Sequence, residues 1–399
     1  MKTLIATFAL VFLCLPIGAV SGSGDIPPEV ARLTDSLRLV YAPDSRVALF
    51  DVDYDFSGKD VMLRGVTTSS EGKRVLKEAL AAEGYRVMDC LEVLPDSDGL
   101  QGKTYGIINL SVASMRREAD YSSEMVTQAL LGMPVRVLQH RDWYRIQTPD
   151  NYIAWVHRAS VCVVTHEELS AWNRADKVVV TSHYGFVYSR PDRGAQTVSD
   201  VVAGDRLKLE GKRGGFYRVA YPDGRKGYLL KADAVPEQKW RTGLKQEARD
   251  IIATAHTLMG VPYLWAGTSS KGMDCSGFVR TVLFMHDIII PRDASQQAYV
   301  GQHVDIAPDF GNLQPGDLLF FGRKATPGHK ERVVHVGIYI GDKRFIHSQG
   351  DVRLSSFEPT DSCFDEYNLG RLLFTTRFLP YIDKEEGLNT TATNPYYKF

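Results

Sequence analysis

The chain has 399 residues, of which 44% are hydrophobic and 24% are charged, and its formal net charge is −1. This balance is typical of globular domains, and the length favours two to four of them. Because basic residues are not in excess, the composition excludes general electrostatic binding to nucleic acid or to an anionic membrane.

Residues 1–22 have the pattern of a signal peptide. Lys2 supplies a positive charge, an apolar run covers 4–15, and small residues follow. The run is too short to span a bilayer. Cys14 lies inside the run and follows a leucine, where a lipoprotein signal carries a small residue, which argues against lipid attachment. We therefore expect export from the cytoplasm and no stable membrane insertion after signal removal.

Four cysteines follow this segment, namely Cys90, Cys162, Cys275 and Cys363. Their spacings are wide and irregular and contain no CxxC pair, so the pattern indicates neither a zinc site nor a disulfide framework. Whether any of them forms a disulfide stays open. Cys90 and Cys162 lie in apolar runs, and we expect both in the core.

Residues 25–105 are expected to form a small α+β domain. Apolar runs at 47–50, 61–63 and 85–93 favour strands, and 71–83 places its apolar side chains on one helical face before a glycine. No group of reactive side chains is present here. A structural or orienting role is the default interpretation of this domain.

The next part of the chain repeats itself at an offset of about 72 residues. Gly132 corresponds to Gly204, and the run that begins at Trp143 corresponds to the run that begins at Phe216. Each copy has short β-branched and aromatic runs between turns, which is typical of small barrels. We therefore predict a first barrel at 106–165, a helical connector at 166–176 and a second barrel at 177–236.

Residues 243–382 contain the reactive side chains. Asp274 is a preferred N-cap residue, and the apolar residues after it follow the spacing of a buried helix face. Cys275 is then the first residue of a helix, where the positive end of the helix dipole favours thiolate over thiol. Gly277 keeps the first turn narrow, so that a substrate backbone can approach.

Two histidines downstream are placed to activate this cysteine. His335 and His347 are twelve residues apart on the two strands of one predicted hairpin. Strand side chains alternate between faces, so the two rings share a face only if the connection has an odd length. We predict a loop of three or five residues rather than a two-residue turn at Gly341-Asp342. Because a nucleophile needs a base and the base needs an orienting partner, His335 would deprotonate Cys275 and His347 would hold His335.

Four motifs in this part resemble the NlpC/P60 family of cysteine peptidases. They are Asp274-Cys275-Ser276-Gly277-Phe278, the Leu-x-Pro-Gly-Asp-Leu run at 313–318, His335-Val336-Gly337-Ile338-Tyr339, and His347. The two predicted barrels resemble bacterial SH3 (SH3b) domains. The expected fold is thus α+β, with a papain-like NlpC/P60 catalytic domain preceded by two SH3b-type barrels and a small α+β N-terminal domain.

The resemblance implies a substrate and a mechanism. The family hydrolyses peptidoglycan stem peptides or muropeptides at the bond between the γ-carboxyl of D-glutamate and an L-diamino acid. Cys275 would attack, His335 would act as base and then as acid, and His347 would be the orienting third member. One subfamily carries SH3b domains before the peptidase domain and releases L-Ala-γ-D-Glu from peptides with a free N-terminus, and this chain resembles it in domain order.

The resemblance also implies substrate-binding residues. Tyr263 matches the active-site tyrosine of the family. Asp293 matches the aspartate that binds the terminal amine, although Ala294 replaces the serine that follows it in the family motif. Tyr152 of the first barrel matches a residue that closes the site, and Glu124 is added from its neighbourhood. The expected substrate-binding residues are Tyr263, Asp274, Ser276, Asp293, Tyr152 and Glu124.

No metal ion or organic cofactor is expected, because the thiol mechanism needs none. We expect a monomer that is exported to the periplasm or cell envelope of a bacterium and binds no nucleic acid, with a mobile polar tail at 383–399. Three other functions remain open: a wall-binding protein with an inert third domain, an acyltransferase or amidase on the same fold, and an endopeptidase that cuts intact peptidoglycan without needing a free amine. The preferred diamino acid, and whether the wall fragments are the cell's own, are not readable.

Overall fold

The computed structural model describes residues 26–398, so the predicted signal peptide lies outside the described residues. Two units can be distinguished within this part of the chain. The first holds the residues up to Pro43 together with Leu49–Val93, and the second holds Asp44–Ala48 together with the residues from Leu94 onward. The short segment Asp44–Ala48 therefore belongs with the later domains, although it is surrounded in sequence by the first unit.

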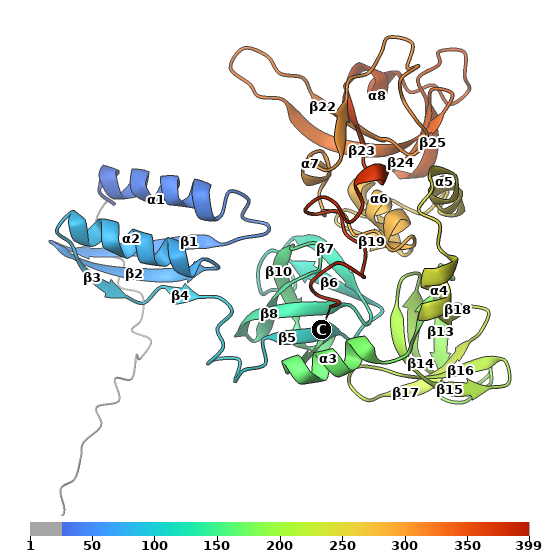
Figure 1. Cartoon of the computed structure of the whole chain (residues 1–399), viewed down its shortest axis with the longest axis horizontal. Coiled ribbons are helices and arrows are strands. Elements are labelled where there is room, and N and C mark those ends of the chain that lie inside the picture. Colours follow the sequence, from blue (N-terminus) through green and yellow to red (C-terminus); the bar gives the residue numbers. More distant parts are fainter. Residues whose placement is uncertain (1–25, 399) are drawn as a thin grey trace, which may run out of the picture. The chain divides into compact units, whose positions relative to one another are not determined.

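The first unit is a four-stranded sheet with two helices packed against it and against each other (Figure 1). Its elements are α1 (Pro28–Tyr41), β1 (Phe50–Ser57), β2 (Asp60–Thr67), α2 (Ser70–Ala82), β3 (Arg86–Asp89) and β4 (Glu92–Val93). Strands β1 and β2 form an antiparallel pair, and β3 and β4 both pair with β2 in parallel.

Two details of this unit differ from the sequence-based expectation. Helix α1 was not predicted, although Pro28 at its start and the buried Val30, Thr34 and Leu37 on one face are a helical signal. The prediction that Cys90 lies in the core was wrong, because this residue follows β3 and is exposed. All four described cysteines are free thiols.

Two seven-stranded sheets follow, one for each predicted barrel. The first contains β5 (Tyr105–Ile108), β6 (Val112–Arg116), β7 (Met125–Leu130), β8 (Pro134–Arg141), β9 (Trp143–Gln147), β10 (Ile153–His157) and β11 (Val161–Val164). The second contains β12 (Lys177–Val180), β13 (Tyr184–Tyr188), β14 (Thr197–Val202), β15 (Arg206–Arg213), β16 (Phe216–Ala220), β17 (Lys226–Leu230) and β18 (Ala234–Pro236).

The strand order shows that the two barrels are copies. The first sheet runs β11-β5-β8-β9-β10-β6-β7, and the second runs β18-β12-β15-β16-β17-β13-β14, which is the same path. Gly132 and Gly204 occupy equivalent turns and have φ values of 80° and 94°, a conformation that favours glycine. A Cβ atom on Gly132 would also lie 2.2 Å from the Arg206 carbonyl oxygen, so the turn tolerates no side chain.

Short helices connect the domains. Helix α3 (His166–Arg174) joins the barrels and begins with a capping box formed by Thr165 and Glu168. Helix α4 (Glu237–Gly243) follows the second barrel. Single 3-10 turns occur at Arg158–Ser160 and Leu379–Tyr381.

The third domain is a six-stranded sheet of order β21-β26-β22-β23-β24-β25. Its strands are β21 (Gln302–Val304), β22 (Leu318–Arg323), β23 (Arg332–Gly341), β24 (Arg344–Gln349), β25 (Asp351–Ser356) and β26 (Leu372–Arg377), with a small pair formed by β19 (Thr268–Ser269) and β20 (Gly272–Met273). Its helices are α5 (Ala248–Thr257), α6 (Cys275–Phe284), α7 (Ala294–Gln297) and α8 (Glu366–Gly370). Every residue of α6 is buried, and the helix packs against β23 and β24.

The β23–β24 hairpin corrects one prediction. The connection is a two-residue turn at Asp342 and Lys343, which both have positive φ, and not a loop of three or five residues. The odd residue is supplied instead by a β-bulge between Tyr339 and Gly341. The bulge shifts the register by one, so that His347 lies opposite Gly337 and on the face that carries His335.

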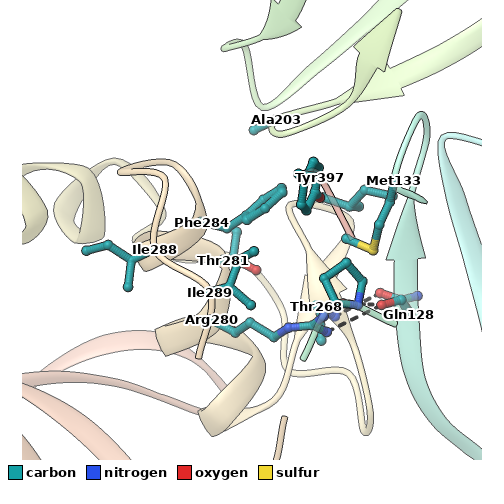
Figure 2. Close-up of a pocket in the computed structure, with 12 residues that line it drawn as sticks. Gln128, Met133, Ala203, Thr268, Arg280, Thr281, Phe284, Ile288, Ile289 and Tyr397 are labelled. Carbon is teal, nitrogen blue, oxygen red and sulfur yellow. Dashed lines mark hydrogen bonds between the residues drawn. The ribbon is translucent and has the colours of Figure 1, made fainter. Parts of the chain in front are cut away.

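The prediction of a mobile tail at 383–399 was wrong for its described part. Leu388 is fully buried, Asn394 donates to the Pro149 carbonyl at 2.9 Å, and the Tyr396 hydroxyl lies 3.0 Å from Gln147 Oε1. The tail thereby crosses from the third domain to the first barrel. Figure 2 shows Tyr397 in an apolar pocket beside Phe284 of α6, which marks this pocket as part of the interdomain core.

Candidate active site

Cys275 is the first residue of α6, as the sequence predicted. The Asp274 side chain accepts a hydrogen bond from the Gly277 N–H at 2.7 Å, which is the expected N-cap contact. Gly277 has no room for a side chain, because a Cβ atom there would lie 1.9 Å from the Gly267 carbonyl oxygen. The helix start is therefore packed tightly against the preceding loop.

A buried arginine that the sequence reasoning missed holds this helix start. Arg292 is 1% exposed and binds the Asp274 carboxylate through two contacts of 2.7 and 3.2 Å. It also donates to Ser276 Oγ at 2.9 Å. Asp274 and Ser276 were predicted to bind substrate; both are buried and engaged in this network, so their visible action is to fix the position of Cys275.

The thiol of Cys275 is protonated in this state. Burial raises its pKa to about 12, and the nearby Asp274 charge acts in the same direction. The backbone N–H groups of Ser276 and Val336 and the charge of Arg292 oppose the rise without cancelling it. Burial of the sulfur thus opposes the thiolate that its position at the helix start was predicted to favour.

The two predicted histidines are joined directly. His335 Nε2 and His347 Nδ1 are 2.7 Å apart, and both side chains are almost fully buried. Burial lowers both pKa values, that of His335 well below its usual range and that of His347 to about 4, so both rings are neutral at neutral pH. The Cys275 sulfur lies against the N–H of Val336, the residue after His335. Within the described residues it makes no hydrogen bond to either ring, so proton transfer from Cys275 to His335 stays a prediction.

Two polar residues that the sequence reasoning missed extend this pair. His347 Nε2 is 3.0 Å from Ser355 Oγ, and Ser355 Oγ is 3.1 Å from Asp365 Oδ2. Ser355 lies on β25 and Asp365 precedes α8. No local sequence signal connects them to the histidines, because the contacts depend on how the β24–β25 hairpin and α8 are packed.

Asp293 has a partner that the sequence did not suggest. Its carboxylate accepts from Arg46 Nη1 at 2.7 Å, and the same nitrogen donates to Ser295 Oγ at 2.9 Å. Arg46 is in turn held by Asp44 through contacts of 2.7 and 2.8 Å. The segment Asp44–Ala48 thus reaches the catalytic domain.

The remaining predicted residues lie in the same neighbourhood. Burial raises the pKa of Tyr152, and so does the charge of Asp293 nearby. Tyr263 is half-buried; its pKa is raised by burial and by the proximity of Cys275. Glu124 accepts from the indole N–H of Trp265 at 3.0 Å, two residues after Tyr263. The structure therefore brings residues of the first barrel to the loop that precedes the cysteine.

A cysteine at the start of a helix that packs on a sheet carrying a histidine pair is the arrangement of papain-like cysteine peptidases. Comparison with family models agrees: the NlpC/P60 family model matches residues 260–371, and the bacterial dipeptidyl-peptidase Sh3 domain model matches residues 115–161. The chain belongs to the NlpC/P60 family of cysteine peptidases.

The alignments with curated relatives are longer than the match to the peptidase family model. The chain is 33% identical over 270 residues to the gamma-D-glutamyl-L-lysine dipeptidyl-peptidase of Bacillus cereus, an alignment that covers 65% of this chain and 77% of the relative. It is 26% identical over 250 residues to dipeptidyl-peptidase 6 of Lysinibacillus sphaericus, covering 61% of this chain and 86% of the relative.

A solved structure gives the same result. The crystal structure of an NlpC/P60 family protein from Bacillus cereus is similar with a TM-score of 0.58 and 27% identity, covering 69% of this chain and all of that one.

In the described part of the chain no helix is long and apolar enough to cross a membrane. Nor do the described residues contain a cluster of three His, Cys, Asp or Glu side chains that could hold a metal ion.

Proposed function

We propose that this protein cleaves the bond between the γ-carboxyl of D-glutamate and an L-diamino acid in peptidoglycan stem peptides or muropeptides. We further propose that it requires a free amine on the N-terminal L-alanine and releases L-Ala-γ-D-Glu. The names of its relatives support the bond that is cut. The observation that carries the amine requirement is the charge balance around Asp293.

Five charged side chains form this cluster. Asp44, Asp274 and Asp293 contribute three negative charges and Arg46 and Arg292 contribute two positive ones, which leaves one negative charge. Arg46 binds both Asp44 and Asp293, whereas Arg292 binds Asp274 and lies 3.9 Å from Asp293, so two positive charges are shared among three carboxylates. A substrate ammonium beside Asp293 would neutralise the remaining negative charge of the cluster, whereas an acylated N-terminus would not.

The proposed reaction begins from a neutral thiol and a neutral imidazole. His335 takes the proton from Cys275 while the sulfur attacks the γ-carbonyl. The imidazolium then gives this proton to the leaving amine as the C–N bond breaks and a thioester remains. Water attacks the thioester, His335 accepts its proton, and that proton returns to the sulfur as the acid product leaves.

Backbone groups at the helix start would stabilise the oxyanion. The N–H groups of Cys275 and Ser276 belong to the first two residues of α6, which have no intrahelical acceptor. Donors held rigidly in this way stabilise charge that develops in the transition state without having to reorganise. The tight packing of Gly277 against Gly267 supports such rigidity.

The test is a comparison of two substrates with the purified protein. L-Ala-γ-D-Glu-diaminopimelate should be hydrolysed, and its N-acetylated form should react at least tenfold more slowly. Equal rates would instead identify an endopeptidase without an amine requirement. A Cys275→Ala variant should be inactive and folded.

The same assay separates the other functions that the sequence left open. Products in which an added amine has replaced water would identify an acyltransferase. Wall binding without any turnover by the wild type would identify a binding protein. We also propose that the protein acts outside the cytoplasm, since its substrates are fragments of the cell wall.

A further inference from the structure

A chain of four polar side chains extends from the predicted base to the edge of the domain. It runs from His335 through His347 and Ser355 to Asp365, with successive contacts of 2.7, 3.0 and 3.1 Å. His347 is fully buried and Ser355 is 4% exposed, whereas the Asp365 side chain at the outer end is 17% exposed. Among the described residues, the rings and the Ser355 hydroxyl make no other side-chain hydrogen bond, so the protons of this series must be arranged in one direction.

Asp365, at the outer end of this series, sets the direction in which the hydrogen bonds are donated. Burial alone would raise the pKa of Asp365, but hydrogen bonds from Asn368 and Ser355 outweigh it and hold this pKa below its usual range. The ionised carboxylate has no proton to give, so it accepts from every partner. The Ser355 hydroxyl must consequently donate to Asp365 and can only accept from His347.

The arrangement then propagates inward. Because Ser355 accepts, His347 carries its proton on Nε2, and its Nδ1 is a bare acceptor. His335 must therefore donate to it from Nε2. A neutral imidazole carries one proton, so Nδ1 of His335 is left with a lone pair and is able to take a proton.

We propose that Ser355 and Asp365 are positioning residues that fix the tautomers of both histidines and so prepare Nδ1 of His335 to deprotonate Cys275. This inference rests on the proposed thiol mechanism. No proton moves along the chain during the reaction. The thiol proton goes to Nδ1 of His335 as the sulfur–carbon bond forms, and the other protons stay where they are while the carboxylate favours the resulting imidazolium.

An Asp365→Asn variant should reverse the whole chain. Asp365 also caps α8, accepting from the Asn368 backbone N–H at 2.9 Å. This N–H cannot rotate, so the amide oxygen of the variant takes the capping position. Its amide nitrogen then faces Ser355 and also the Asn368 side-chain amide, which must turn its oxygen toward the new donor. Ser355 then accepts from it and donates to His347, His347 donates to His335, and the proton of His335 moves to Nδ1, where it blocks the base.

The prediction is a characteristic order of activities. Asp365→Asn should lower kcat by at least 100-fold with KM changed by less than about twofold; a wrong histidine tautomer costs about 10⁴-fold in serine proteases. Ser355→Ala breaks the chain without reversing it and should cost only about tenfold. The double variant Ser355→Ala/Asp365→Asn should therefore be more active than Asp365→Asn alone.

Two controls make the experiment decisive. Asp361 lies in the same loop as Asp365, but its carboxylate pairs with Arg344 and takes no part in the series of hydrogen bonds from His335 to Asp365. Asp361→Asn should therefore keep kcat within about twofold. Melting temperatures identify variants that are merely unfolded. A structural role for Asp365 predicts that the double variant is the least active of the three, and this result would overturn the inference.

The outcomes also separate this inference from the proposed function. Residual hydrolysis by Cys275→Ala would remove the thiol mechanism itself. An inactive Cys275→Ala variant together with wild-type kcat in Asp365→Asn would leave the mechanism standing and remove only the role of Ser355 and Asp365.

Discussion

Replacing Asp293 by asparagine tests the charge argument with the smallest change in shape. The variant keeps an oxygen that can accept from Arg46, whose Nη1 lies 2.7 Å from the carboxylate. It removes one negative charge, so the cluster changes from one net negative charge to none. The substrate ammonium then loses its counter-charge but not its space.

The size of the effect follows from the exposure of the site. Two unit charges about 4 Å apart attract by about 4 kcal/mol at an effective dielectric constant of about 20. The Asp293 side chain is 30% exposed, so solvent reduces this attraction, and the ammonium also loses hydration on binding. A hydrogen bond to a charged group contributes about 1.5 to 3 kcal/mol. We therefore expect the loss of the Asp293 charge to weaken binding of the substrate ammonium in the transition state by about 2 kcal/mol, which corresponds to roughly 30-fold in kcat/KM.

The assay measures kcat/KM for the free and the N-acetylated tripeptide with each variant. Asp293→Asn should lower kcat/KM for the free peptide roughly 30-fold. It should leave kcat/KM for the acetylated peptide unchanged, because this peptide has no N-terminal ammonium to pair with Asp293. Asp305→Asn is the matched control, because the Asp305 side chain is 99% exposed. An unchanged ratio of the two substrates, or an equal fall in both, would refute the reasoning.

Two further predictions concern the histidine pair. In Gly337→Ala the added Cβ atom would lie 3.2 Å from the His347 Cβ and 3.1 Å from a Phe345 ring carbon. Overpacking of about 1–3 kcal/mol should lower the melting temperature, displace His347 and reduce kcat about tenfold. A wild-type kcat would show that the position of the His347 ring is not critical. Because burial holds the pKa of His335 well below its ordinary value of about 6.5, the base stays neutral as the pH falls, and kcat/KM should decline only well below that pH. With the free peptide it should decline again above about pH 8 as the substrate amine loses its proton, and this second decline should be missing for the acetylated peptide.

Local structure around Cys275 was readable from the sequence. The N-cap at Asp274, the helix that follows and the shared face of His335 and His347 all depend on neighbours in sequence or on strand alternation. The internal repeat at Gly132 and Gly204 was readable for the same reason, since each copy carries the same turn. These are features that short-range sterics and hydrogen bonding determine.

Long-range contacts were not readable. Arg46 reaches Asp293 across 247 positions, and the Ser355–Asp365 contact depends on the packing of α8. The raised pKa of Cys275 was also not predicted. The helix dipole is a local property, whereas desolvation depends on everything that packs around the sulfur. The β23–β24 hairpin is an intermediate case. The sequence predicted that an odd number of residues separates the paired strands, but not that a bulge at Ile340, rather than a longer loop, provides the extra residue.

Gln147 gives the first barrel an unexpected dependence on distant chain segments. Its amide nitrogen donates to the Val47 carbonyl at 3.0 Å, and its amide oxygen accepts from the Tyr396 hydroxyl. One side chain beside Tyr152 therefore binds both an early and a late segment of the chain. During synthesis this junction can form only after residue 396 has been added. Trimming or extending the polypeptide near that point should therefore weaken peptide capture while leaving the reactivity of the sulfur intact, a pattern that is easily mistaken for poor substrate choice.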